Sequence, residues 1–201
     1  MIVARLRRGL SGMAAGGPVA ATWPSGSNWP GADAAIRPAR LIDGGSVTHH
    51  PVGSPEPLDD RVAFVDGTQR MELLGYVGTA PIVVAEVRAA VRERKGGRLT
   101  TVISERAVMA IGRPAALAAA GGLLDGLERI GIEEGPPHPY RDFTEARRAV
   151  DRIRGNAELH AAERYRQESD AWLILDGSLS GSPALAVDPR AIGIVKSHAV
   201  L

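Results

Sequence analysis

Apolar residues gather in short, β-rich runs in the middle of the chain, and turn-forming residues separate these runs. Three of them, at 61–66, 71–78 and 80–88, are rich in Val, Ile, Leu, Phe and Tyr and follow one another closely. Such runs predict strands, and short links predict that consecutive strands pair antiparallel. Lys95-Gly-Gly-Arg98 predicts a turn, after which 99–104 forms a further strand or continues a hairpin.

The second half of the chain changes to helical spacing. Residues 114–130 are rich in Ala and Leu and predict a helix that Gly121-Gly122 interrupts. A further helix begins near residue 144, because Ala146, Val150 and Ile153 recur at intervals of four and three. Gly155-Asn156 is expected to break this helix, and Asn156 to cap another that continues to about residue 168.

Two more strands are expected at 171–176 and 191–195. Before residue 61 the pattern is different, because Gly, Pro, Ser and Ala dominate from about residue 10 to residue 60. This composition predicts loops rather than a packed element. We therefore expect an irregular N-terminal extension over 1–60 and one ordered domain over 61–201.

Two of the predicted strands end in the same way. Arg61-Val-Ala-Phe-Val-Asp66-Gly-Thr and Ala171-Trp-Leu-Ile-Leu-Asp176-Gly-Ser each run apolar residues into Asp-Gly and then a hydroxyl. An unalternated apolar run predicts a strand buried on both faces, and the glycine permits a sharp turn after the aspartate. Ligands of open α/β sheets bind at the carboxyl ends of strands. Asp66 and Asp176 are therefore candidates to share a divalent metal.

Three antiparallel strands followed by helix and strand, with Asp on the first and fourth strands, is a ribonuclease H-like layout. We predict an α/β fold with a mixed five-stranded sheet and flanking helices. In that layout a third carboxylate comes from the helix before the fourth strand, where Glu158 and Glu163 stand about 140° apart at ~100° per residue. Glu158 is the first choice and Glu163 the reserve.

This set of residues suits phosphodiester hydrolysis. Three carboxylates bind Mg²⁺ or Mn²⁺, and two such ions about 4 Å apart activate a water and stabilise the leaving oxygen. Lys196 would neutralise the negative charge on the phosphate in the transition state, or hold the attacking water. Ser197 and His198 would contact phosphate or accept a proton. Arg70 and Ser178, next to the two Asp-Gly pairs, are further candidate phosphate contacts.

The motifs resemble those of the NurA nuclease family. The resemblance rests on Phe64-Val-Asp-Gly-Thr-Gln-Arg70, Leu173-Ile-Leu-Asp-Gly-Ser-Leu179 and Ile192-Gly-Ile-Val-Lys-Ser-His198, and it covers roughly 60–201. It implies a ribonuclease H-like, manganese-dependent nuclease that acts on DNA ends in double-strand-break resection. It also implies a homodimer that works with a HerA-type hexameric ATPase. By motif, Asp66 and Asp176 become metal ligands, and Lys196 and His198 become active-site residues.

Family members generally continue with helices after the Lys-Ser strand, so we expect a member that is incomplete at its C-terminus. Two other hypotheses remain open. An actin-like or sugar-kinase-like fragment would use an Asp-Gly-Thr turn to hold nucleotide phosphates. A non-catalytic remnant of a nuclease domain would bind a partner.

Composition limits the other options. Lys plus Arg is 24 against 23 for Asp plus Glu, so bulk charge favours neither nucleic acid nor membrane. Arg88, Arg92, Arg94 and Lys95 form either a phosphate-tracking patch or a solvated face. The chain has no cysteine, which excludes disulfides and thiolate metal sites. No stretch is long and apolar enough for a membrane span or a signal peptide, so we expect a soluble cytoplasmic protein.

Overall fold

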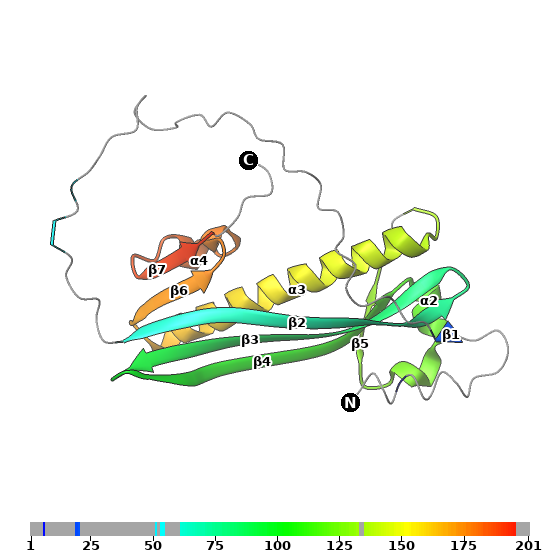
Figure 1. Ribbon diagram of the computed structural model, residues 1–201, viewed down its shortest axis with the longest axis horizontal. Coiled ribbons are helices and arrows are strands. Elements are labelled where there is room, and N and C mark those ends of the chain that lie inside the picture. Colours follow the sequence, from blue (N-terminus) through cyan, green and yellow to red (C-terminus); the bar gives the residue numbers. More distant parts are fainter. Residues whose placement is uncertain are drawn as a thin grey trace, which may run out of the picture.

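A mixed β-sheet with one long helix on a face forms the centre of the molecule in the computed structural model (Figure 1). The structure describes residues 6, 19–20, 51, 53–54, 61–132 and 135–195. In this part of the chain the sheet has seven strands, in the order β5-β4-β3-β2-β6-β7, and β1 also pairs with β2. The predicted α/β class with a mixed sheet is confirmed, with two strands more than expected.

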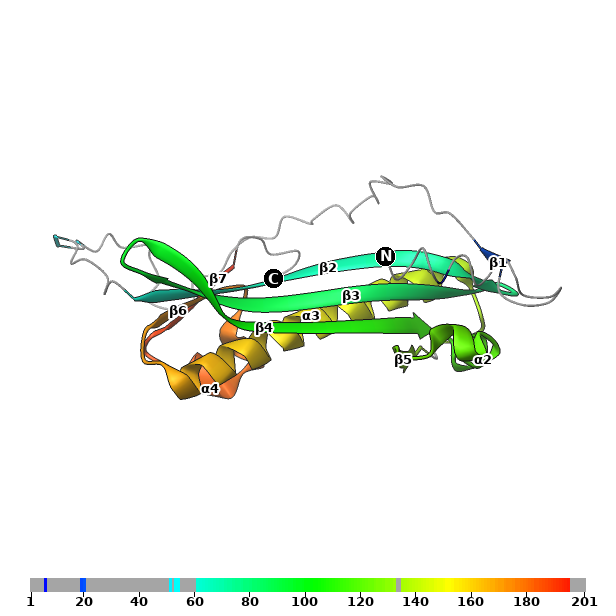
Figure 2. The same cartoon turned by 90° about the horizontal axis from the view of Figure 1, so that it is seen from below.

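Three long strands make up most of the sheet: β2 (Val62–Val77), β3 (Ala80–Lys95) and β4 (Arg98–Gly112). They form an antiparallel meander (Figure 2). Gly78 turns the first hairpin with φ 59°, and Gly96 and Gly97 turn the second with φ 57° and 72°. Positive φ at both central residues suits the right-handed twist of a two-residue hairpin, so the predicted turn at 95–98 is confirmed.

The division of this meander into strands differs from the prediction. Residues 61–66 and 71–78 do not form two strands, because β2 runs through Asp66-Gly67 without a turn. Asp66 pairs with Ala90 and Gly67 with Ala89, so the ladder to β3 is continuous there. The expected turn after Asp66 is therefore wrong. A partner strand of equal length keeps this segment extended.

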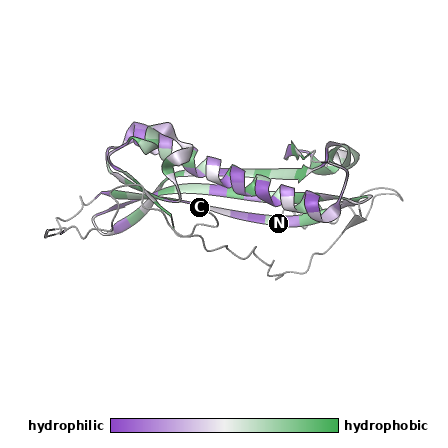
Figure 3. Ribbon diagram, turned by 90° about the horizontal axis from the view of Figure 1, so that it is seen from above, coloured by the Kyte–Doolittle hydropathy of each residue, from purple (hydrophilic) through white to green (hydrophobic). Residues whose placement is uncertain are grey.

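One helix, α3 (Pro139–Glu168), crosses one face of the sheet (Figure 2). Pro139 occupies its first turn, and the His138 ring accepts a hydrogen bond from the Arg141 N–H at its N-terminus. Its apolar side turns toward the sheet and its polar side toward solvent (Figure 3). The predicted break at Gly155-Asn156 is wrong, because packing on the sheet outweighs the ~1 kcal/mol cost of a helical glycine.

The core beneath α3 comes from alternate positions of the strands. Ala63 and Val65 of β2 pack with Ala161, Ala162 and Tyr165 of the helix. Farther along, Leu73 packs with a second set of helix residues, namely Ala146, Ala149 and Val150. Because side chains alternate along a strand, Phe64, Asp66, Thr68 and Arg70 point to the opposite, open face.

After α3 the chain adds two parallel strands beside β2. These are β6 (Trp172–Asp176) and β7 (Ala191–Ile194), linked through η2 (Leu179–Gly181) and α4 (Pro183–Ala186). β6 pairs parallel with β2, and β7 pairs parallel with β6. The sheet order β4-β3-β2-β6-β7 is that of the predicted ribonuclease H-like core.

The expected helix over 114–130 is only partly present. The structure has a short α2 (Pro114–Ala119), η1 (Gly121–Leu124) and the edge strand β5 (Glu128–Gly131). Gly121 has φ 49° and divides the segment, as left-handed glycines do at helix ends. α2 and η1 cover the end of the sheet that lies farthest from β6, where Leu117 and Leu124 pack on Leu74 and Ile82.

Most of the first sixty residues lie outside the described part of the chain. Within it, Val19–Ala20 form β1, which pairs antiparallel with Tyr76 and Gly75 of β2. The division into an extension and a domain stays a prediction. None of the helices described has an apolar stretch of the length needed to span a membrane.

Candidate active site

Asp66 and Asp176 lie next to each other on neighbouring parallel strands. The last pair in the register between β2 and β6 is Val65 with Leu175, and the two aspartates follow it directly. Both are exposed. Oδ1 of Asp66 accepts a hydrogen bond from the Gly67 N–H at 2.9 Å, which holds this carboxylate against the strand. The structure thus brings together the two carboxylates that the repeated motif singled out.

Glu158 approaches the same place from α3. Its carboxyl group packs directly on Gly67, where an added Cβ would overlap Oε1 and lie 2.9 Å from Cδ and Cγ. Real Cβ atoms essentially never approach so closely. The glycine after Asp66 therefore provides the space that the helix carboxylate occupies.

The electrostatics of Glu158 show that the three carboxylates interact. Burial raises the pKa of Glu158, and the negative charges of Asp66 and Asp176 raise it further. Arg154, one turn earlier on α3, opposes this effect through an ion pair of 2.5 Å between Nη1 and Oε1 of Glu158. Clustered carboxylates repel one another unless a cation compensates them, and in this structure Arg154 supplies that cation.

A polar network fixes Arg154 in turn. Its Nε donates to Oε1 of Gln69 at 3.2 Å, and Nε2 of Gln69 donates to Oδ1 of Asp151 at 2.6 Å. Gln69 therefore connects β2 to α3 beside the carboxylates. Since both ends of the network lie on one helix, the position of Glu158 depends on the packing of α3 against β2.

The donor chemistry of this site fits a hard divalent cation. Asp66, Asp176 and Glu158 offer carboxylate oxygens only, which is what Mg²⁺ and Mn²⁺ prefer. Over the residues described, however, no three His, Cys, Asp or Glu side chains stand close enough together to form a ready metal group. Glu158 faces Arg154 instead, so a bound ion would have to draw this carboxylate toward the aspartates.

The other predicted residues lie in three different places. The reserve carboxylate Glu163 accepts a 2.5 Å hydrogen bond from Oγ of Ser182 at the start of α4. Arg70 forms an ion pair of 2.6 Å with Glu72 on the open face of β2. Ser178 caps η2 through the Ser180 N–H at 3.1 Å. Lys196, Ser197 and His198 lie outside the described residues.

Sequence reasoning missed several residues that shape the site. Gly67 was expected to turn the chain, whereas its function is to make room for Glu158. Arg154 precedes Glu158 by four residues, a helical ion-pair spacing that the sequence displays. Gly193 is the third: an added Cβ there would lie 2.6 Å from the Gly177 carbonyl oxygen. Gly193 thus allows β7 to lie close to the backbone that follows Asp176.

The chain was compared with protein families, curated proteins and solved structures. No protein-family model matches the chain, and no curated protein matches it. Among solved structures, the fold is similar to the crystal structure of the NurA nuclease from Sulfolobus solfataricus, with a TM-score of 0.38 and 16% identity. The likeness covers 61% of this chain and 28% of that one, so this chain spans less than a third of the length of that protein.

Proposed function

We propose that this protein is a metal-dependent DNA nuclease that hydrolyses phosphodiester bonds at DNA ends. The observation that supports this most is the placement of Asp66 and Asp176 side by side on β2 and β6, with Glu158 packed on Gly67, where the charges of both aspartates raise its pKa. Two-metal hydrolysis of a phosphodiester uses divalent cations, which hard oxygen ligands hold. The proposed ion is Mn²⁺ or Mg²⁺, held by these three carboxylates.

Each residue has a distinct task in this proposal. The bound ions would lower the pKa of a water and stabilise the leaving oxygen. Asp66 and Asp176 would hold them from the rigid sheet. Glu158 would complete the ligand set, and Arg154 and Gln69 would position it. Without a cation the carboxylates repel a phosphate, so the metal should strengthen substrate binding at this point of the strand. Lys196, Ser197 and His198, with Arg70 and Ser178, are proposed phosphate or proton-transfer groups.

The motif resemblance extends this proposal. The wider role would be that of the NurA family: end resection at double-strand breaks, as a homodimer and with a HerA-type hexameric ATPase. These partners would explain how a chain with balanced charge is brought to DNA. The homodimer and the ATPase are independent of the carboxylate site, and a nuclease assay on the chain alone does not require them.

The direct test is degradation of linear single- and double-stranded DNA in Mn²⁺, Mg²⁺ or EDTA. We expect metal-dependent cleavage, and a loss of about 100-fold or more in Asp66→Asn and in Asp176→Asn, the scale for one group that stabilises a charged transition state. Asp125→Asn, at an exposed aspartate paired with Arg129 near β5, is the matched control. Full activity of either site variant would refute the metal-site assignment.

A thermal melt provides a readout that does not depend on turnover. A ligand that binds only the folded state raises its stability by mass action. We expect Mn²⁺ to raise the melting temperature of the wild type and of Asp125→Asn, but not of Asp66→Asn or Asp176→Asn.

One observation favours a second hypothesis, a non-catalytic remnant that binds a partner. Glu158 is ion-paired with Arg154 and forms no ready metal group with the aspartates in the part of the chain described. A folded protein whose melting temperature does not change on addition of Mn²⁺ would support this hypothesis. The actin-like hypothesis required a phosphate-holding turn at Asp66-Gly67-Thr68, and β2 runs straight through these residues.

A further inference from the structure

The open face of the sheet carries an ordered set of side chains around the two aspartates. In the row after Asp66, Thr68 pairs with Arg88, and Arg88 with Arg106 on β4. Arg70 and Glu86 form the next row. Same-face neighbours along a strand are about 6.8 Å apart. Arg88 therefore stands one row along and one strand across from Asp66, and Arg106 stands one strand farther, on the face to which Asp66 points.

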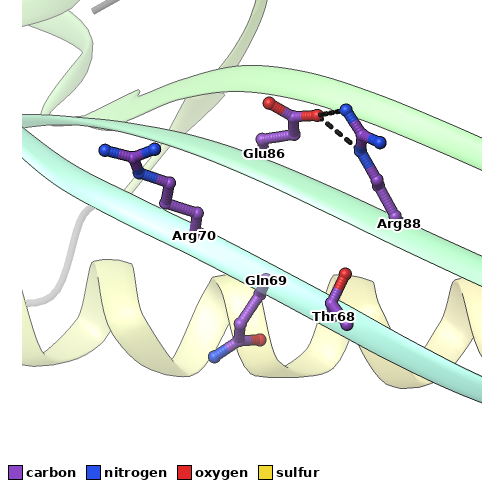
Figure 4. Close-up of a pocket in the computed structure, with 5 residues that line it drawn as sticks. All are labelled: Thr68, Gln69, Arg70, Glu86 and Arg88. Atoms are coloured by element: carbon purple, nitrogen blue, oxygen red, sulfur yellow. Dashed lines mark hydrogen bonds and ion pairs between the residues drawn. The ribbon is translucent and has the colours of Figure 1, made fainter.

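Glu86 holds these two arginines in place. Its Oε1 accepts hydrogen bonds from Nε of Arg88 at 2.7 Å and from Nε of Arg106 at 2.8 Å (Figure 4 shows Arg88). The hydrogen bonds from Arg106 and Arg88 lower the pKa of Glu86 to about 2, so the group is ionised at neutral pH. One carboxylate thus fixes two guanidinium groups, and the trio keeps a net positive charge.

The arginines remain accessible although Glu86 binds them. Their side chains are 61% and 49% exposed for Arg88 and Arg106. A hollow of about 320 Å³ lies beside them, lined by Thr68, Gln69, Arg70, Glu86 and Arg88. In Figure 4, Thr68 and Arg70 point to the same side as Glu86, whereas Gln69 points toward α3. Prepositioned guanidinium groups in a hollow are suited to phosphate oxygens.

An exposed aromatic ring stands on the other side of the aspartates. Phe64 is 38% exposed, two residues before Asp66, and its cross-strand partner on β3 is Arg92. Ile174 on β6 is the partner of Phe64 on the other side. A ring on an open sheet face beside an arginine is a platform on which an unpaired base stacks.

We infer that the open face of β2, β3 and β4 binds single-stranded nucleic acid, with phosphates on Arg88 and Arg106 and a base on Phe64, so that the backbone passes over Asp66 and Asp176. This inference rests on the proposed function for the choice of ligand. A single strand is favoured over a duplex because only unstacked bases can reach an aromatic ring on a sheet. The arginines and the ring then fix the strand on both sides of the metal site.

The test measures binding in EDTA, where cleavage does not occur. The full chain is titrated against a fluorescent single-stranded oligonucleotide, and anisotropy is followed at several salt concentrations. We expect Arg88→Gln/Arg106→Gln to weaken binding about tenfold and to reduce the salt slope by about 1.4, the value for two lost phosphate contacts on a single strand. Arg147→Gln/Arg152→Gln, at two exposed arginines of α3, is the matched control and should bind normally.

Two further variants separate the contributions. Arg88→Lys/Arg106→Lys keeps both charges and should retain most of the salt slope, which distinguishes lost phosphate contacts from misfolding. Phe64→Leu should weaken single-strand binding several-fold and leave the salt slope unchanged, because stacking releases no counterions. Circular dichroism melts confirm that each variant is folded.

Several outcomes would overturn the inference: wild-type affinity in Arg88→Gln/Arg106→Gln, equal losses in the α3 control, or heparin binding as tight as oligonucleotide binding together with no effect of Phe64→Leu. The last result would indicate a general polyanion surface. The proposed function fails separately. If the protein binds the strand in EDTA but never cleaves it in Mn²⁺, the nuclease proposal is refuted and the binding inference stands. If the protein cleaves DNA but the arginine and Phe64 variants bind normally, the binding inference is refuted and the nuclease proposal stands.

Discussion

The two Asp-Gly pairs begin with the same local sequence and end in different structures. Asp176 closes β6, and Gly177 leaves the strand with φ 144°. Asp66 and Gly67 lie inside β2 and pair with Ala90 and Ala89. The difference comes from the neighbouring strands. β3 continues beside β2 for its full length, whereas the pairing of β6 with β7 ends at Asp176 and Ile194.

The Asp-Gly pair therefore specifies a small residue and a carboxylate rather than a turn. At Gly177 the glycine is required by the backbone conformation, and Figure 1 shows the chain leaving the sheet after β6. At Gly67 it is required by the space that Glu158 fills. Both arrangements present an aspartate at the same point between two parallel strands. Substituting the glycines one at a time separates the two requirements.

Gly193→Ala should have the largest effect on stability, because it acts on the backbone that follows Asp176. Its Cβ would lie 2.6 Å from the Gly177 carbonyl oxygen and 3.1 Å from Cγ of Leu179. A backbone carbonyl cannot move aside as a side-chain end can, so we expect the free energy of unfolding to fall by about 3 kcal/mol. Urea denaturation measures this, and a loss below about 0.5 kcal/mol would show that β7 adjusts freely.

Gly177→Ala should come next, with a loss of about 2 kcal/mol. Nothing lies within 4 Å of an added Cβ at Gly177, so the cost is conformational. A φ of 144° is strained for any residue with a Cβ. The same urea experiment measures it, with Gly155→Ala as control, because Gly155 has equal space but lies inside α3. The control should gain up to about 1 kcal/mol.

The sequence predicted the order of the elements well, because that information is contained in local patterns. The runs at 171–176 and 191–195 are apolar over a strand length, and they correspond to β6 and β7. The turn at 95–98 was evident from two adjacent glycines. The placement of Asp66 beside Asp176 also followed, since it needs only the strand order of the core.

The errors concern segments that a distant partner controls. Nothing local indicates that β2 continues through Gly67 or that α3 continues through Gly155, because β3 and the sheet stabilise those conformations. Nor can a sequence show that Glu86 holds two arginines from different strands. Such contacts depend on register, which is set only when the strands pair.

Gly67→Ala should have the smallest effect on stability and a specific effect on the site. The atoms that its Cβ would overlap are the flexible end of Glu158, which can swing away, so we expect a loss of at most about 1 kcal/mol. The displaced carboxylate would then be unable to serve the metal site, and the rise in melting temperature caused by Mn²⁺ should shrink. Adding Glu158→Ala removes the overlap and should restore the stability without restoring the Mn²⁺ response. Gly67→Ala could instead lower the free energy of unfolding as much as Gly193→Ala does. In that case the backbone conformation requires a glycine at Gly67, as it does at Gly177, and the two Asp-Gly pairs have the same structural requirement.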